Sequence, residues 1–386
     1  MQFAIKQIVA VVAAAWLIAY EYKPVDVPPY PNVVSGANGR QPTNGSAVRD
    51  QTGSVAVHAL PVEDAAPGKS EQPSQGKDAA ALRLPPATIT RHPFGGETVI
   101  EPAIVHNFQT EFLRGEIRGG GPKPGVVRCR HKPTGYETVP HMPLHALLMP
   151  EWLLKPGNGR KGIFWPPVRA KPRVSVDGGS VVFHIDAGQM QDWNMDVTFR
   201  YTPARDWIDF ECRIVPRVAI DDFEMFVASY VIEDMESTRV SAKTSTGEEF
   251  KKIDCRKTVP WGSVYTIARD AAAKDYLLDG RWDLPPREAG RDLWQDYYFD
   301  RPILIAMKES TGLAVVTMAD AKVCSLLAGQ HHAEETAHDF AFNADLEPGE
   351  PFVGRARVVV RNIGTFPEAA EKIDGMWREF GESLSD

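Results

Sequence analysis

The densest group of titratable side chains lies in residues 330–339, which hold three histidines and three carboxylates. Imidazoles titrate near neutral pH, so such a group could supply an acid–base pair or bind a metal. The segment falls between two expected strands and is interpreted as a loop. It matches no established zinc spacing, so we expect no metal. His331 and His332 are catalytic candidates, with a solvated polar loop as the alternative, whereas His338 shares a strand face with apolar residues and should be buried.

Other histidines are candidates by their position. His106 lies on an early expected strand and could face a cleft, although a lone strand histidine is more often structural. His141 and His145 have the spacing of two ligands on one helical face, but three nearby prolines interrupt that segment. Apart from a metal pair, the functional alternative is that one of these two histidines acts as a base or contacts a substrate. We keep His106 and His141 as catalytic candidates, and His184 is a weaker one.

Charged side chains alternate with apolar ones over residues 193–214 and form one face of an expected hairpin. Opposite charges on neighbouring strands stabilise a sheet by only about 0.2–1 kcal/mol per pair, so a solvated surface is one interpretation. The other is a groove that binds sugar hydroxyls or carboxylates, for which arginine is a bidentate donor. Arg200 is the catalytic candidate on this face, and Glu211 and Arg213 are substrate-binding candidates. Comparable charges are Asp209 on the hairpin and Arg355, Arg357 and Arg361 on the last strand.

Two groups of aromatic residues flank proline-containing loops. A long connection over residues 270–295 carries Trp282 and Trp294, and Tyr297 follows it. Loops of this length are usually functional or disordered. Aromatic rings have broad apolar faces that suit the C–H faces of pyranose rings, so these three residues are substrate-binding candidates, with loop or core packing as the alternative. The second group is Trp152, Phe164 and Trp165.

The elements that must position these residues are antiparallel strands. Between residues 193 and 214, apolar and polar residues alternate on both sides of a turn, and one packed face with one wet face is typical of an antiparallel sheet. The Gly-Gly pair after Asp177 predicts a second hairpin. Residues 303–307 and 313–318 are apolar on both faces, which predicts a strand pair that is covered on both sides. A helix over residues 366–384 should close the chain and dock by its apolar stripe.

Composition disfavours several functional classes. A formal net charge of −8 over 386 residues argues against a nucleic-acid partner, which needs a basic field. No nucleophile elbow, P-loop or dinucleotide fingerprint occurs, because the triple glycine at 119–121 is followed by Pro122 and opens no helix. We therefore expect no cofactor. The four cysteines lie far apart without a C-x-x-C pair, so they are either small buried hydrophobic residues or, after export, disulfide partners with three possible pairings.

Three segments are predicted from composition. Residues 1–23 carry Lys6 before a short apolar run, as a secretory signal peptide does, with a retained membrane anchor or a buried start as alternatives. Residues 24–95 are rich in Pro, Gly and Ser and should form a disordered linker. Residues 96–386 should form a β-sandwich domain that ends in the helix. Export would make the protein periplasmic or secreted, with an N-terminal membrane tether as the alternative. The sequence determines no oligomeric state.

The succession of about a dozen expected strands between residues 97 and 361 resembles the galactose-mutarotase-like supersandwich. This fold occurs in aldose epimerases and in the β domains of many polysaccharide lyases and glycoside hydrolases. Two passages carry most of the resemblance, MDVTFRYTPARDWIDFECRI and HDFAFNADLEPGEPFVGRARVVVR. No functional residue is carried over. The resemblance implies an all-β fold, a large antiparallel β-sandwich with a concave sheet face and loops that commonly meet a saccharide.

These features together predict an exported protein that engages a saccharide or polysaccharide. If it is an enzyme, its chemistry should be proton transfer at a sugar carbon or a glycosidic bond, as in a lyase, an epimerase or a glycoside hydrolase. A His or Tyr would act as the base, and an Arg or a second His would stabilise developing negative charge. The alternative is a non-catalytic carbohydrate-binding or cell-surface interaction module, which needs an aromatic platform but no convergent acid–base group.

Overall fold

The computed structural model describes residues 88–91, 97–100, 104–119, 124–139, 145–155, 161–162, 171–190, 192–232, 235–244, 247–253, 263–277, 295–331, 335–366 and 368–385. The chain divides into two units, and all of these residues belong to the one made of Arg83–His92 and Gly96–Asp386. The predicted signal segment 1–23 lies outside the described residues, as does most of the predicted linker. Within the described part, no helix is long and apolar enough to cross a bilayer.

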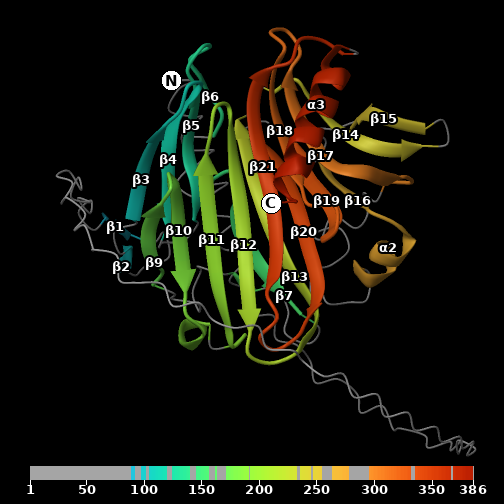
Figure 1. Cartoon of the computed structure of the whole chain (residues 1–386). Helices are drawn as coiled ribbons and strands as arrows, with labels where there is room; N and C mark the ends of the chain where they lie inside the picture. Colours follow the sequence, from blue (N-terminus) through green and yellow to red (C-terminus); the bar gives the residue numbers. More distant parts are fainter. Residues whose placement is uncertain are drawn as a thin grey trace, which may run out of the picture. The chain divides into compact units, whose positions relative to one another are not determined.

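Every strand pair of the described residues is antiparallel, which confirms the all-β class (Figure 1). In spatial order, the largest sheet has nine described strands: β15 (Gly247–Lys252), β14 (Ser237–Thr244), β17 (Tyr298–Lys308), β18 (Leu313–Ala319), β21 (Phe352–Asn362), β12 (Trp207–Pro216), β11 (Met195–Pro203), β10 (Ser180–Ile185) and β9 (Arg173–Asp177). A second sheet has six: β16 (Ser263–Ala268), β19 (Cys324–His331), β20 (Glu335–Leu346), β13 (Ile220–Ile232), β7 (Met149–Leu154) and β8 (Lys161–Gly162).

The smaller elements complete the described unit. A four-stranded sheet contains β3 (Ile104–Gln109), β4 (Leu113–Gly119), β5 (Gly125–His131) and β6 (Tyr136–Glu137). A two-stranded sheet pairs β1 (Thr88–Arg91) with β2 (Glu97–Ile100). The described helical elements are the short 3-10 helix η1 (Ala187–Gln189) and the α-helices α2 (Ala271–Leu277) and α3 (Glu368–Ser383).

The hairpin that the alternating pattern predicts is formed by β11 and β12. Phe199 lies opposite Cys212 in this pair, and the rings of Phe199 and Phe210 stack with their centroids 5.9 Å apart. Both rings are buried in one core with Phe340 and Phe342 from β20 of the six-stranded sheet. The two large sheets therefore pack face to face, with the apolar side of each strand turned inward.

The pair β17 and β18 is covered on both sides, as predicted. Leu304 and Val315 point into the core between the sheets, whereas Ile305 and Val316 belong to a second cluster on the opposite face. Helix α3 covers that second face, as Figure 1 shows. The predicted helical stripe is confirmed, because the helix buries Ala369, Ile373, Met376 and Phe380.

The prediction of a loop over residues 330–339 is wrong for most of that segment. Strand β19 extends to His331 and β20 begins at Glu335, with Gln330 opposite Ala337 and His331 opposite Thr336. The polar composition of this segment suggested that its backbone N–H and C=O groups bond to water. Instead, they are satisfied by the ladder of hydrogen bonds between the two strands. His338 is fully buried, as expected, and its Nδ1 lies 3.1 Å from Thr317 Oγ1.

Three of the four cysteines are buried free thiols, which confirms the hydrophobic interpretation for them. Cys129, Cys212 and Cys324 form no disulfide. Burial raises the pKa of Cys129 to about 12 and that of Cys212 well above its usual value, because a thiolate would be desolvated. These two thiols are therefore poor nucleophiles. Cys255 lies outside the described residues.

We expect Asp270 to contribute stability that disappears in acid. Its Oδ1 accepts a hydrogen bond from Ala273 N at 2.7 Å at the start of α2, and its Oδ2 accepts one from Arg269 at 2.9 Å. These bonds lower the pKa of Asp270 from its usual 3.8, so its contribution is present above that pH and is lost as the pH falls through the lower folded value.

Asp270→Ala should cost about 1 kcal/mol of unfolding free energy at neutral pH, and Asp270→Asn less, since Asn also caps helices. Urea denaturation over a pH series would test this. An Ala variant that keeps the wild-type pH dependence would contradict it.

Candidate acid–base site

Three side chains capable of acid–base chemistry meet on the outer face of the six-stranded sheet. On β13, Val227 and Val231 point into the core between the sheets, and Tyr230 points the other way. The imidazole of His145 stacks on the Tyr230 ring, with centroids 4.4 Å apart and planes inclined by 14°. The Tyr230 hydroxyl donates a hydrogen bond to Glu151 Oε2 at 3.3 Å. All three residues are half-buried, so the cluster keeps some access to solvent.

A β-bulge places Glu151 in this cluster. Strand β13 pairs with β7 so that Phe226 is opposite Trp152 and Val227 is opposite Pro150, which leaves Glu151 as the extra residue. A bulge bends its strand and redirects the side chain at that point. The bulge is therefore the local reason why a carboxylate on β7 reaches the Tyr230 hydroxyl.

The backbone before β7 brings His145 to the same ring. Tyr230 N donates to Ala146 O at 3.0 Å, which extends the pairing of β13 beyond the start of β7. On the other side, Val126 of β5 and Leu147 exchange two backbone hydrogen bonds of 3.0 and 2.9 Å. The residue that precedes Ala146 is consequently held beside Tyr230.

Gly125 allows this close approach, and we expect Gly125→Ala to disturb it. Gly125 has φ +137°, and a Cβ there would lie 2.8 Å from Leu147 O and 3.0 Å from the Ala146 Cβ. The variant should lose more than about 1 kcal/mol of unfolding free energy, measured by urea denaturation. Gly178→Ala is the matched control, because Gly178 also has positive φ (+55°) but no atom lies near its added Cβ. If Gly125→Ala costs no more than the control, the close approach is unimportant.

The cluster joins side chains of the kinds that general acid–base catalysis uses. An imidazole can accept or donate a proton, and a phenol held by a carboxylate offers a hydrogen-bonding oxygen. A second carboxylate lies nearby, because Asp339 on β20 is opposite Ala228 and so shares the outer face with Tyr230. This combination suits abstraction of a proton from a carbon or hydroxyl and its return.

The sequence-predicted catalytic residues are spread over the fold. His106 is half-buried on β3 of the four-stranded sheet, opposite Ile117. Arg200 lies on β11 of the nine-stranded sheet and donates to Asp177 at 3.1 Å. His331 ends β19, where only its backbone is described. His141 and His332 lie outside the described residues.

The predicted binding residues do not form one group either. Tyr297 is only 9% exposed and packs under Lys251, whose Nζ lies 4.1 Å from the ring centroid. Arg213 is exposed on β12, and Glu211 accepts a hydrogen bond from a neighbouring arginine. Trp282 and Trp294 lie outside the described residues.

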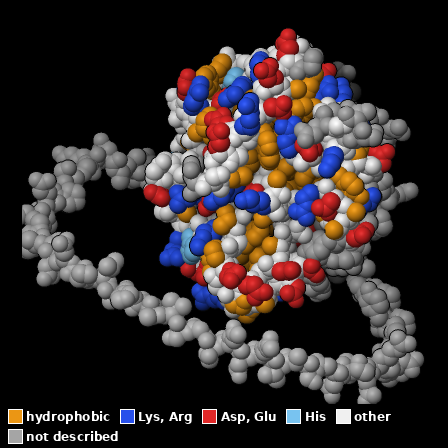
Figure 2. All heavy atoms as spheres, turned by 45° about the vertical axis from the view of Figure 1, so that its right-hand side comes forward, with side chains coloured by type: hydrophobic (Ala, Val, Ile, Leu, Met, Phe, Trp, Pro, Cys, Tyr) orange, Lys and Arg blue, Asp and Glu red, His pale blue; other side chains and the backbone are white. Residues whose placement is uncertain are grey.

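The charged face of the nine-stranded sheet is a ladder of ion pairs between β12 and β21. In the register, Asp209 is opposite Arg357 and Glu211 is opposite Arg355, and a third carboxylate just before β12 pairs with Arg361, so these three arginines are neutralised. On the face drawn in Figure 2, acidic and basic side chains are interspersed over much of the surface, and acidic ones gather at its lower end. The pairs are Arg355–Glu211 (2.8 Å), Arg357–Asp209 (2.6 and 3.0 Å) and Arg361–Asp206.

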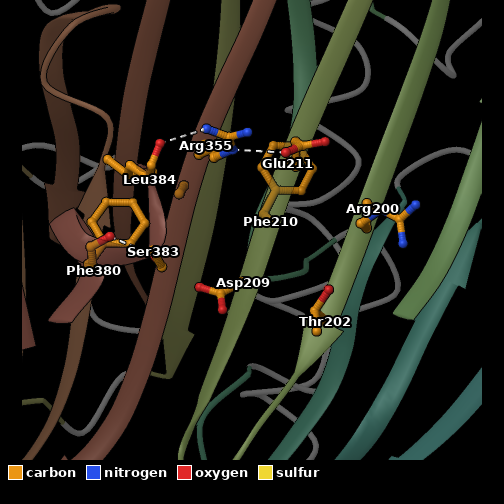
Figure 3. A pocket seen from close by; sticks show the side chains of 10 residues that line it. Arg200, Thr202, Asp209, Phe210, Glu211, Arg355, Phe380, Ser383 and Leu384 are labelled. Carbon is orange, nitrogen blue, oxygen red and sulfur yellow. Dashed lines mark hydrogen bonds and ion pairs between the residues drawn. The ribbon is translucent and has the colours of Figure 1, made fainter. Parts of the chain in front are cut away.

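A pocket of about 160 Å³ opens between this ladder and the end of α3 (Figure 3). Arg355 points toward Glu211 and the carbonyl of Leu384, whereas the Arg200 guanidinium points away from them. The Thr202 hydroxyl lies 2.7 Å from that of Ser180. Because these polar groups bond to one another, the pocket fits the docking of α3 better than it fits a reactive centre.

A histidine and two aspartates on β10 and β11 could in principle hold a metal. One ligand atom from each of His184, Asp186 and Asp196 lies within 4.8 Å of the others. However, Arg173 bonds Asp186 at 2.8 Å and Arg217 bonds Asp196 at 3.1 Å. The arginines already supply the positive charge that a cation would bring, so the donor set fits a metal poorly.

From the sequence, His145 is a candidate only together with His141, and Tyr230 and Glu151 are not candidates. Tyr230 lies in an apolar strand run, where it resembles a packing residue. The signal that could have indicated Glu151 is Pro150, since proline within a sheet is confined to edges and bulges.

Comparison with known proteins shows that this chain is similar to several solved structures in fold. No protein-family model and no curated protein matches the sequence. Among solved structures, a galactose mutarotase related enzyme from Lactobacillus acidophilus has a TM-score of 0.44 at 8% identity, over 67% of this chain and 98% of its own. A galactose mutarotase-like protein from Lactobacillus casei has a TM-score of 0.42 at 9% identity, over 67% of this chain and 100% of its own. The α-N-acetylgalactosaminidase of Bifidobacterium bifidum has a TM-score of 0.45 at 12% identity, over 72% of this chain and 39% of its own.

These matches include galactose mutarotase-like proteins, the group that the strand succession resembles. They concern the arrangement of strands and carry no activity to this chain.

Proposed function

We propose that this protein is a carbohydrate-active enzyme that transfers a proton at a sugar carbon or glycosidic bond, with His145 as the general acid–base. The observation that carries the proposal is the contact of His145, Tyr230 and Glu151, because it joins an imidazole, a phenol and a carboxylate at one half-buried point. Such groups, correctly placed, typically accelerate proton transfer by about 10²–10⁴-fold.

Each residue of the cluster has a distinct role in this proposal. His145 exchanges the proton with the substrate. The ring of Tyr230 holds the imidazole by stacking, and its hydroxyl oxygen can accept a hydrogen bond from a sugar hydroxyl. Glu151 orients that hydroxyl by accepting its proton in a hydrogen bond. The saccharide as substrate class follows from the strand-pattern resemblance, and the type of chemistry follows from the residues.

The experiment is a substrate screen with the purified full chain. Anomerically pure aldoses would be followed by NMR for interconversion, aryl glycosides for phenol release, and uronic acid polymers for the ultraviolet absorbance of unsaturated products. Binding to a glycan array would be measured in parallel. We expect turnover of at least one class that is lost in His145→Gln. Glycan binding without turnover of any class would instead support the non-catalytic module.

A further inference from the structure

The backbone that carries His145 is tied to all three larger sheets of the described unit. Leu147, two residues after His145, pairs with Val126 on β5 of the four-stranded sheet. Leu148 N donates to the Ser229 hydroxyl at 3.0 Å, on β13 of the six-stranded sheet. Leu148 O accepts a hydrogen bond of 2.9 Å from the Tyr201 hydroxyl, on β11 of the nine-stranded sheet. This short segment is therefore braced from both sides of the sandwich.

Leu148 adopts a conformation that a leucine rarely adopts. Its φ is +53°, in the left-handed region that disfavours bulky side chains, and it is fully buried. Buried backbone groups need hydrogen-bond partners, and here both partners are side chains, Ser229 and Tyr201, rather than a strand ladder. Strain of this kind persists only when surrounding contacts impose it, and it clusters at functional sites.

The environment of Tyr201 keeps its hydroxyl protonated, so that it remains a hydrogen-bond donor. Its side chain is fully buried, with its ring 5.9 Å from that of Phe183 and 5.1 Å from that of Phe210. Burial raises the pKa of its hydroxyl well above the usual value, so the proton stays on the oxygen. The neighbouring rings fix the direction in which that hydroxyl points.

We propose that Tyr201 and Ser229 are positioning residues for the acid–base site and act on it through Leu148. His145 precedes the left-handed residue and Glu151 follows it, yet both contact Tyr230. The turn at Leu148 thus determines whether imidazole and carboxylate can meet the same ring. The catalytic part of this inference rests on the proposed function, whereas the positioning of His145 does not.

The variants Tyr201→Phe and Ser229→Ala test the brace in the full chain. With the substrate found in the screen, each should lower kcat about 10- to 100-fold and change KM less than about twofold, because a displaced general base slows the reaction more than it weakens binding. The matched control is Ser325→Ala, which, like Tyr201→Phe, removes a buried hydroxyl that donates to a backbone carbonyl, here Ala341 O at 3.3 Å. The control should leave kcat unchanged.

A second measurement does not depend on turnover. The imidazole protons of His145, assigned by their loss in His145→Gln, should show the ring-current shift of a group stacked on Tyr230. That shift should disappear in Tyr201→Phe and Ser229→Ala and persist in Ser325→Ala. Loss of the shift supports positioning even if no sugar is turned over, a result that would reject only the proposed function. An unchanged shift in both brace variants overturns the inference.

Discussion

His145→Gln is expected to lower kcat/KM by about 10²–10⁴-fold on the saccharide that the wild type turns over, because the variant keeps a polar side chain but cannot carry a proton. Steady-state kinetics provides the measurement. The unfolding free energy should change little, since His145 is half-buried outside the main core.

Two further variants make this result interpretable. Tyr230→Phe keeps the ring beneath the imidazole but removes the hydrogen bond to Glu151, so its effect should be smaller than that of His145→Gln. His184→Gln is the control, because that histidine lies on β10 and bonds Thr198 at 2.9 Å, away from the cluster. Equal losses in His184→Gln and His145→Gln would refute an assignment of the acid–base role to His145.

Asp209→Ala should be the most destabilising substitution on the charged face, with a loss of about 3–5 kcal/mol of unfolding free energy. The guanidinium of Arg357 is only 4% exposed and makes two hydrogen bonds to Asp209, at 2.6 and 3.0 Å. It also lies over the rings of Trp207 and Phe380, which hold it under α3. Removing the carboxylate leaves this buried charge without its partner. Urea denaturation monitored by tryptophan fluorescence measures the loss.

The neighbouring rung of the ladder provides the comparison. Glu211→Ala breaks the 2.8 Å pair with Arg355, but those side chains are 31% and 33% exposed, so water can replace the bond. Its cost should be about 0–1 kcal/mol. The double variant Asp209→Ala with Arg357→Met should recover much of the lost stability, since both charges are gone. If the two single substitutions cost the same, burial of Arg357 does not determine the energy.

Much of the fold could be predicted because local patterns carry it. The side chains of a strand alternate between two faces, so the apolar set in β11 and β12 could be assigned to the core without knowledge of the facing sheet. The two apolar faces of β17 and β18 likewise indicated cover on both sides, and the stripe of α3 supplied one of the covers. The segment around His331 was misjudged because its ladder depends on a partner strand rather than on its own polar composition.

The sequence by itself determined the strands, the closing helix and the burial of the alternate residues, since each depends on the spacing of residues along one strand or helix. Only the tertiary structure decided where His145, Tyr230 and Glu151 meet. Their contact requires an extra residue in β7 and a left-handed Leu148, which is held by a hydroxyl from the opposite sheet. Tyr201 is 53 residues from Leu148 in the chain, and no local pattern in either segment records that hydrogen bond.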